Sequence, residues 1–342
     1  MPWSPLHAQI HRTLRQRSLL PQKQRLLVAV SGGQDSLCLS QLLLDLQAKW
    51  KWSLAIAHCD HRWRTDSEAN AEYVAHLAHT WQLPYHQRSA RVQLSSEAAA
   101  RAWRYQMLTE LALAHGYAYV VTGHTASDRA ETLLYNLLRG SGTDGLQALT
   151  WQRPLGTDTL NLKLVRPLLG LTRSETGQFC QARGLNVWPD ATNDHLKYAR
   201  NRIRQELLPY LQEHFNPQVE LGLAQTAEIM QAEVEYLNSL AHDLYQRALG
   251  RADDCNQSRQ NQRLPIRLNR QILRQAPVAI QRRAIRCMLQ DVLPHPPNFD
   301  QIEKLTALIK APNRSRTDPL PGGAIAEVEG DWIWVKCNNH HN

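Results

Sequence analysis

Short apolar runs alternate with helix-like segments through the first 140 residues of the chain. Residues 26–30 form an apolar run with two β-branched valines that ends at a glycine pair, and leucines then recur at helical spacing from residue 37 to residue 46. The same criteria predict strands at 53–57 and 117–122, and helices at 67–81, 97–114 and 127–138. This alternation predicts an α/β fold, with a Rossmann-like parallel sheet and helices on both of its faces.

The pattern changes in the second half of the chain. A capping box from Thr172 to Glu175 opens a helix that ends near Gly184, and helical character returns at 198–211. The turn dipeptide Asn216-Pro217 separates two helical patterns, so we expect a domain boundary after residue 215. Further helices are predicted at 219–249, 278–291 and 299–310, and a β-hairpin at 325–328 and 332–336. We therefore expect two domains, 1–215 with the parallel sheet and a smaller, mostly helical domain at 216–342.

The composition excludes several classes of protein. With 43% hydrophobic and 20% charged residues among 342, the chain is expected to fold, and no window of about 18 apolar residues lacks charges. We therefore expect neither a membrane span nor a secretory signal. The six cysteines form no CxxC pair, which argues against a zinc ribbon, a CxxC-held cluster and a disulfide scaffold. A reducing, cytoplasmic setting is the expectation.

Positive charge gathers in two parts of the chain. Residues 1–200 hold 22 basic and 15 acidic side chains, and residues 251–286 hold nine arginines against two aspartates. The stretch between them, 201–250, holds three basic and seven acidic side chains. Such clustering indicates either a solvated surface or the footprint of a nucleic acid.

The loop at residues 31–36, with the sequence SGGQDS, directly follows the first strand and opens the first helix. Its glycine pair permits a close backbone approach to a ligand, and a helix N-terminus attracts anions. Asp35 in this loop suits either a Mg²⁺ ligand or a helix cap. The alternative is a plain strand–helix turn with a serine cap. The spacing matches neither Walker A nor GxGxxG, but it is similar to the loop of the N-type ATP pyrophosphatases, which implies cleavage of ATP between its α and β phosphates.

Further motifs narrow this resemblance over about residues 24–215. They are 58–64 (HCDHRWR), 97–105 (EAAARAWRY), 123–132 (GHTASDRAET), 138–142 (LRGSG), 166–169 (RPLL), 188–193 (WPDATN) and 200–204 (RNRIR). In this order they resemble the tRNA(Ile)-lysidine synthetase family, apart from Thr192, where that family more often has serine. The remainder of the chain, with Arg282-Arg283, is similar to the family's smaller C-terminal domain.

The resemblance implies a two-step ligase reaction. The wobble cytidine of an isoleucine tRNA with a CAU anticodon is adenylated at carbon 2 with release of pyrophosphate. The amine of free L-lysine then displaces AMP and forms lysidine. ATP, Mg²⁺, lysine and the tRNA are thus the expected cofactors and partners, and the family resemblance also allows a homodimer.

The sequence offers candidates for each task. The candidates for binding ATP are Ser31, Gly32, Gly33, Gln34, Asp35, Ser36, His58, Asp60, His61, Gly123 and His124. Asp35, through Mg²⁺, and the arginines Arg104, Arg200 and Arg204 are the candidate catalytic residues, because a guanidinium forks to phosphate oxygens. The histidines are alternatively ordinary loop residues, and the arginines are alternatively surface residues of amphipathic helices.

Asp128 and Glu131 are the candidates for binding the lysine substrate. They share one face of a helix at i and i+3, and one of them is a candidate general base. Stabilisation of the helix dipole is the alternative. The candidate tRNA contacts are Arg101, Arg139, Arg282 and Arg283.

Three other functions compete with this one. A tRNA thiolase needs a sulfur-carrying cysteine or a cluster, and Cys38 in the loop helix suits a small core residue better. A small-molecule ligase has no use for the arginine-rich C-terminal half. A non-catalytic RNA-binding protein has no use for Asp35 in an intact loop.

Overall fold

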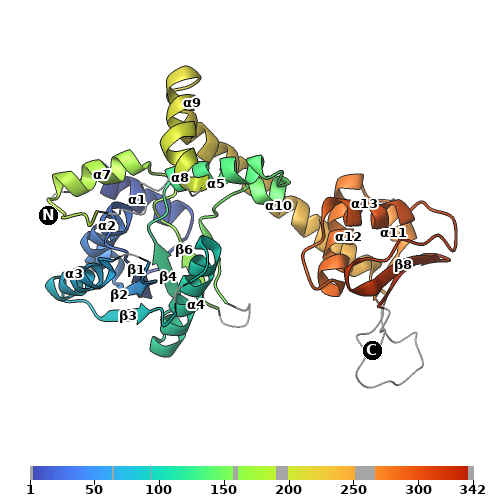
Figure 1. Ribbon diagram of the computed structural model, residues 1–342, viewed down its shortest axis with the longest axis horizontal. Helices are drawn as coiled ribbons and strands as arrows, with labels where there is room; N and C mark the ends of the chain where they lie inside the picture. The colour runs from blue at the N-terminus through green and yellow to red at the C-terminus, as the bar shows by residue number, and fades with distance from the viewer. Residues whose placement is uncertain are drawn as a thin grey trace. The chain divides into compact units, whose positions relative to one another are not determined.

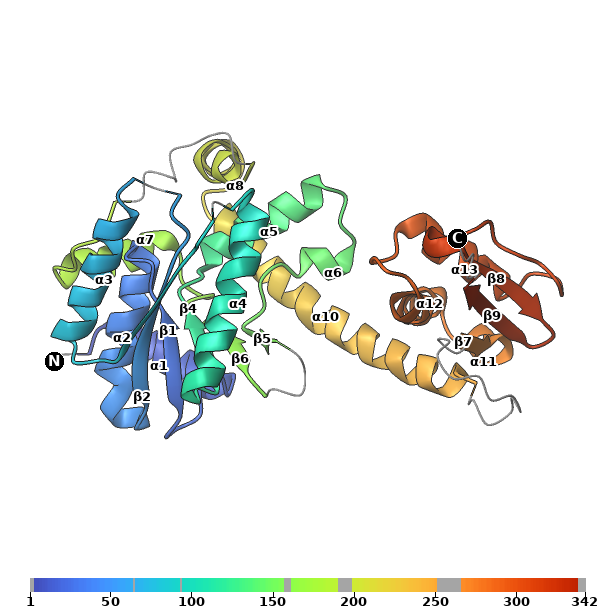
Figure 2. The ribbon, with the colours of Figure 1, turned by 60° about the horizontal axis from the view of Figure 1, so that its bottom comes forward.

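A computed structural model describes residues 3–63, 65–92, 94–156, 161–189, 199–250 and 266–337. The chain divides into two compact units, Met1–Gln231 and Ala232–Asn342. The first unit contains a six-stranded sheet in the order β3-β2-β1-β4-β6-β5 (Figures 1 and 2). Its strands are β1 (Arg25–Ala29), β2 (Ser53–Asp60), β3 (Tyr85–Ser89), β4 (Tyr119–Thr122), β5 (Gln152–Pro154) and β6 (Lys163–Val165).

All neighbouring strands of this sheet run parallel except β5, which pairs antiparallel with β6. The expected α/β architecture is confirmed. The helices of the first unit are α1 (Pro5–Gln16), α2 (Gln34–Trp50), α3 (Ser67–Thr80), α4 (Glu97–His115), α5 (Ala126–Leu138), α6 (Thr143–Leu146), α7 (Arg173–Ala182), α8 (Ala199–Arg202), the π-helical turn η3 (Ile203–Leu207) and α9 (Leu208–His214). A further helix, α10 (Val219–Ala248), begins in the first unit and ends in the second.

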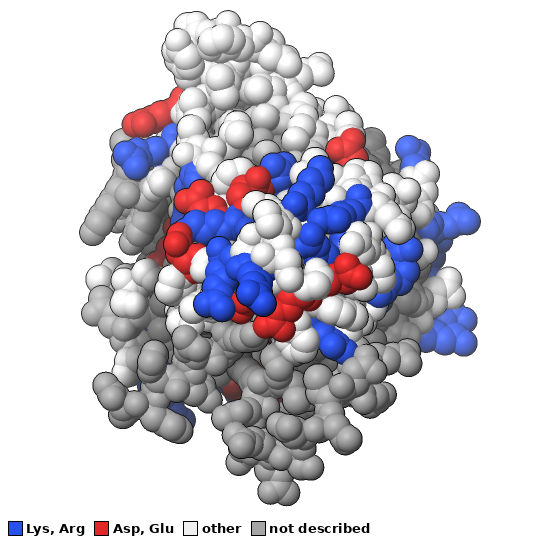
Figure 3. Space-filling model, turned by 90° about the vertical axis from the view of Figure 1, so that its right-hand side faces the viewer, with Lys and Arg blue, Asp and Glu red and all other residues white. Residues whose placement is uncertain are grey.

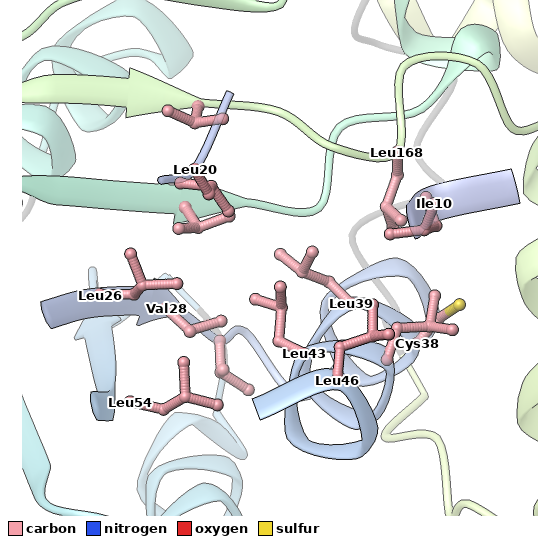
Figure 4. Close-up of a cluster of buried hydrophobic side chains, with 14 of the residues drawn as sticks. Ile10, Leu20, Leu26, Val28, Cys38, Leu39, Leu43, Leu46, Leu54 and Leu168 are labelled. Carbon is pink, nitrogen blue, oxygen red and sulfur yellow. The ribbon is translucent and has the colours of Figure 1, made fainter. Parts of the chain in front are cut away.

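Alternate residues of β1 face the two sides of the sheet, which builds two cores. Leu26 and Val28 pack with leucines of α2 and residues of α1, α3 and α7, as Figure 4 shows for part of the cluster. Leu27 points to the opposite face, where it packs with Leu108 and other residues of α4. The run at 26–30 is thus buried on both faces, as a central parallel strand requires.

The sequence did not reveal the polar edge strand β3, the short strands β5 and β6, or α1. The polar residues of β3 are only half-buried or exposed, so this strand carries no continuous apolar signal. The helix predicted at 198–211 is described from residue 199, and η3 interrupts it before Pro209, which occupies the first turn of α9. The predicted turn at 189–193 lies outside the described residues beyond Pro189.

The second unit packs a small antiparallel sheet against helices. Its elements are the 3₁₀ turn η5 (Pro321–Gly323), the helices α11 (Arg270–Arg274), α12 (Val278–Val292) and α13 (Phe299–Leu308), and the strands β7 (Ile266–Asn269), β8 (Ala324–Glu329) and β9 (Trp332–Cys337). The predicted hairpin is β8–β9, to which β7 adds a third strand. A core of its own, including Ile285, Met288 and Val328, holds this unit together.

The boundary between the two compact units lies between Gln231 and Ala232, whereas the sequence placed a boundary after residue 215. The first half of α10 belongs to the first unit because it is bonded to it. Arg129 of α5 donates to Glu228 and Gln231 of α10 at 2.6 and 3.1 Å. Within the described residues, no helix is long and apolar enough to cross a membrane.

Candidate active site

A cavity of about 510 Å³ opens at the carboxyl ends of β1 and β4. These two strands are neighbours in the sheet although two other strands separate them in the sequence. The order reverses at this point, and ligands of open α/β sheets bind in such a crevice. Predicted site residues that line the cavity are Ser31, Gly33, Gln34, Asp35, Ser36, His61, Arg104, Gly123, His124, Asp128 and Arg204.

The loop after β1 is shaped by its own hydroxyl groups. Ser36 Oγ donates to the Gly33 carbonyl at 2.8 Å, and the Gly33 N–H donates to Ser31 Oγ at 3.3 Å. Gly32 has φ +85°, and a Cβ there would lie 2.7 Å from the Asn70 side chain. Because Gly33 caps α2 without a side chain, the first-turn N–H groups are offered to an anion in the cavity.

A second glycine allows the loop after β4 to touch the loop after β1. A Cβ at Gly123 would lie 2.8 Å from the Asp35 carbonyl oxygen and 3.0 Å from the Ser36 nitrogen. Only glycine fits this approach without a shift of the backbone. His124 is thereby placed beside the anion-binding loop, and its Nδ1 lies 2.9 Å from Thr122 Oγ1.

Arg104 brings positive charge into the cavity wall. Its Nε is buried and has no hydrogen-bond acceptor among the described residues. Burial lowers the pKa of Arg104. A buried guanidinium nitrogen without an acceptor is costly, and a phosphate oxygen in the cavity would satisfy it. On the same side, His61 stacks against Trp63 with 5.8 Å between the ring centroids.

Carboxylates and arginines alternate on the opposite side of the cavity. Arg173 contacts Asp35 at 3.4 Å, Asp128 at 3.0 Å and Glu131 at 3.0 Å. Arg204 contacts Glu131 at 2.7 Å and Asp128 at 3.8 Å. Glu131 is fully buried, and both of its oxygens accept hydrogen bonds from Arg204. Asp128 also caps α5 by accepting from the Thr125 N–H at 2.8 Å.

The electrostatic environment differs among these groups. Burial raises the pKa of Asp35, against the opposing charge of Arg173. For Asp128, burial acts in the same direction, but Arg173, His124, the Thr125 N–H and Arg204 together outweigh it and hold the pKa of Asp128 below its usual range. Burial lowers the pKa of His124 to about 3, although Asp128 opposes the shift. The His124 ring is therefore neutral at physiological pH, while Asp128 is ionised.

Other predicted ATP contacts lie outside the cavity lining. His58 is buried and its Nδ1 lies 2.8 Å from the carbonyl of Val30, so it supports the loop from below. Asp60 is also buried, and it accepts from the Arg62 N–H at 2.8 Å. Gly32 turns the loop without lining the cavity.

The remaining predicted residues lie in several other places. Arg200 donates to Thr132 at 2.7 Å and lies near Glu97. Arg101 lies 5.4 Å from the centroid of the Tyr105 ring. Arg139 lines a smaller cavity between α5 and η3. In the second unit Arg282 pairs with Glu303 at 2.6 Å, and Arg283 contacts Asn238 at 2.5 Å.

Arg173 and Thr176 are site residues that sequence reasoning missed, whereas Trp188 begins one of the family motifs. Thr176 donates a hydrogen bond to Asp35, and Trp188 and Arg173 line the cavity. The capping box at Thr172 does announce the start of α7, which places Arg173 in its first turn. Nothing local indicates that this turn packs on the loop after β1, because the two segments are far apart in the chain.

The cavity fits ATP and a cation held mainly by ATP. Within the described residues, no group of three or more His, Cys, Asp or Glu side chains converges as a metal site. Mg²⁺ beside a nucleotide needs only one or two carboxylates, because phosphates and water supply the other ligands. Asp35 meets this need, since its Oδ2 has a contact of 3.4 Å to Arg173, longer than an ordinary hydrogen bond.

Comparison with known proteins agrees with this geometry. A model of the PP-loop domain matches residues 4–211, and a model of the TilS substrate binding domain matches residues 268–334. A tRNA(Ile)-lysidine synthase of Nostoc sp. is 62% identical, with 98% of each chain covered. That of Synechocystis sp. is 52% identical over 97% of this chain and 98% of the relative. A chloroplastic tRNA(Ile)-lysidine synthase of Zygnema circumcarinatum is 34% identical, over 96% of this chain and 90% of the relative.

A solved structure shares the fold alone. It is a U34-tRNA thiolase of Methanococcus maripaludis, 15% identical, with a TM-score of 0.54 over 66% of this chain and 77% of the thiolase. The sheet, the loop after β1 and the domain match define the first unit as a PP-loop domain, which implies the use of ATP. The chain belongs to the tRNA(Ile)-lysidine synthase family, as the motifs indicated.

Proposed function

We propose that the chain ligates L-lysine to carbon 2 of the wobble cytidine of a CAU-anticodon tRNA(Ile), converting ATP to AMP and pyrophosphate and forming lysidine. One observation carries the proposal. An anion-binding loop and two carboxylates, those of Asp35 and Asp128, line the same cavity, in a chain whose full-length relatives are tRNA(Ile)-lysidine synthases. The loop suits the phosphates of ATP, and the carboxylates suit an ammonium group.

The first step is adenylation of the cytidine. The oxygen on carbon 2 attacks the α-phosphorus of ATP, and the bond to pyrophosphate breaks. The N–H groups at the start of α2, with Ser31 and Ser36, bind the phosphates, and Arg104 stabilises the charge that grows on them. We propose that Arg204 and Arg200 support the same charge from the far side. Asp35 would hold Mg²⁺, which neutralises phosphate charge when bound.

The second step transfers lysine. The lysine amine attacks carbon 2, the bond from carbon 2 to the AMP oxygen breaks, and AMP leaves. Three carboxylates, Asp35, Asp128 and Glu131, face two guanidinium groups, those of Arg173 and Arg204. An ammonium group of lysine would bind among these carboxylates. We propose that Asp128 or Glu131 accepts the proton that the attacking amine loses.

The tRNA requires a positive surface. Figure 3 shows Lys and Arg side chains interspersed with Asp and Glu on one face. We propose that the phosphates of the tRNA contact Arg282, Arg283, Arg101 and Arg139. Three further arginines of the basic stretch 251–286, at positions 251, 259 and 263, lie outside the described residues. A reducing, cytoplasmic setting is supported by the free thiols of four cysteines among the described residues. The homodimer remains a prediction.

The test is incorporation of radiolabelled lysine into an unmodified CAU-anticodon tRNA(Ile) transcript with ATP and Mg²⁺. An elongator tRNA(Met) with the same anticodon is the matched control. Labelling of the first tRNA alone is the expected result. Release of pyrophosphate with tRNA but without lysine incorporation would contradict the proposal and favour another nucleophile, sulfur first.

A further inference from the structure

Arg173 occupies the point where the two halves of the cavity meet. Each nitrogen of its guanidinium group faces a different carboxylate. Nη1 contacts Glu131 and Nη2 contacts Asp128, both at 3.0 Å, and Nε lies 3.4 Å from Asp35. Asp35 belongs to the loop that faces the phosphates, whereas Asp128 and Glu131 belong to α5. A lysine ammonium has three N–H donors on a single nitrogen and lacks the planar, spread geometry of these three contacts.

The backbone of Arg173 is fixed from both sides. Its N–H donates to Ser127 Oγ on α5 at 2.9 Å, and its carbonyl accepts from Gln34 Nε2 on α2 at 2.6 Å. Gln34 also donates to Thr176 on the next turn of α7 at 2.9 Å. The first turn of α7 therefore bridges α2 and α5, and the guanidinium group is held by contacts that do not involve its own charge.

The contact distances favour an effect on the α5 carboxylates over an effect on Asp35. Asp128 and Glu131 are three residues apart on one helix face, and two ionised carboxylates so close repel each other. Arg173 bridges them with two hydrogen bonds of ordinary length, while its contact to Asp35 is longer. Arg204 contributes a second bridge, but its contact to Asp128 is 3.8 Å.

We propose that Arg173 is a positioning residue for the lysine substrate, which holds the Asp128 and Glu131 carboxylates together and aligned for the incoming ammonium group. This rests on the proposed function. Arg173 contributes less to the adenylation step than to the lysine step, because its contact with the loop carboxylate is the longest of the three. The lysine step depends on it, because without it Asp128 loses its shortest contact to a cation.

The experiment compares Arg173→Met and Arg173→Lys with Arg183→Met, using the full chain and tRNA(Ile). Arg183 is a matched control, since it lies at the end of the same helix, is partly buried and pairs with a carboxylate, Asp45, at 3.2 Å. For Arg173→Met we expect KM for lysine to rise by about tenfold to a hundredfold, as for the loss of a charge-assisted hydrogen bond. Pyrophosphate release at saturating ATP should fall by a smaller factor than the rise in KM for lysine, because the Asp35 contact is the longest of the three, and Arg173→Lys should lie between Arg173→Met and wild type.

Three outcomes would overturn the proposal. An unchanged KM for lysine in Arg173→Met would exclude a positioning role. If Arg173→Met lost pyrophosphate release but kept its KM for lysine, Arg173 would instead act on the adenylation step through Asp35. Equal losses of both activities together with a lowered melting temperature, absent in Arg183→Met, would leave only a structural role. Failure of the proposed function is separate, because wild-type enzyme would then label no tRNA(Ile).

Discussion

At the scale of single residues, the site depends on carboxylates whose partners come from distant segments. Asp35 follows the glycine pair, yet its oxygens face Thr176 and Arg173 of α7. Burial would favour its neutral form, and the Arg173 charge opposes this. The same residue type at Asp45, further along α2, instead pairs with His7 and Arg183.

Asp35→Asn removes the negative charge and keeps the side-chain shape. We expect tRNA-dependent pyrophosphate release to fall by about a hundredfold or more, because electrostatic stabilisation at the phosphates is lost. Affinity for tRNA in a filter-binding assay should stay within about twofold. Asp45→Asn on the same helix is the control, with pyrophosphate release close to wild type. A fully active Asp35→Asn variant would remove Asp35 from the mechanism.

At the scale of elements, α5 presents two different faces. Asp128 and Glu131 face the cavity side, while Ser127 and Arg129 contact α10. Arg129 is almost completely buried and pairs with Glu228, which also accepts from Trp151 Nε1 at 2.8 Å. The helix that carries the candidate lysine ligands is therefore anchored to the helix that leads into the second unit.

Glu228→Gln should weaken this anchor. Burial alone would raise the pKa of Glu228, but hydrogen bonds from Arg129 and Trp151 outweigh it and lower the pKa. A carboxylate with a lowered pKa stabilises the fold above its unfolded pKa of about 4.3, and the stabilisation is lost as the pH falls through the folded value. We expect the variant to lose about 2 kcal/mol in the free energy of unfolding at pH 7.

Urea denaturation at pH 7 and at pH 4 checks this prediction. The difference between wild type and Glu228→Gln should be smaller at pH 4, because the wild-type carboxylate is partly protonated there. Glu233→Gln, at an exposed position of the same helix, should change stability by less than about 0.5 kcal/mol. A difference that is independent of pH would show that the charge of Glu228 contributes nothing.

At the scale of the whole molecule, the two family matches lie in two units with separate cores. The PP-loop match lies in the first unit, and the TilS substrate binding match lies in the second. In the second unit, Arg282 and Arg283 lie on α12. Arg282 donates a hydrogen bond to Glu303, and Arg283 donates one to Asn238. These contacts hold the guanidinium groups in place.

The double variant Arg282→Glu/Arg283→Glu should bind tRNA(Ile) more weakly. Each phosphate contact contributes roughly 0.7 to 0.9 to the slope of log affinity against log salt, so the slope should become shallower by about 1 to 2. Filter binding over a salt series measures it. Arg316→Glu, which breaks a pair with Glu327 in the same unit, is the control. Identical slopes for all three proteins would locate the tRNA contacts elsewhere.

The sequence by itself determined three strands of the central sheet and the loop that follows the first of them. Apolar runs and helical leucine spacing are local, so β1, β2, β4 and the helices between them followed from periodicity. The SGGQDS loop and the pair Asp128 and Glu131 also followed, because loop and helix spacing are fixed by neighbouring residues. The motifs that indicated the family are likewise short stretches of neighbouring residues, so they can be read from the sequence alone.

Only the tertiary structure decided which of these residues meet. Pairing β1 with β4 brings Gly123 against the loop after β1, and packing of α7 on α2 brings Arg173 between the carboxylates. The same packing leaves His58 beneath the loop, away from the cavity lining. The attachment of α10 to α5 moves the unit boundary to Gln231. Such contacts join residues about 30 to 140 positions apart in the chain, so no local pattern specifies them.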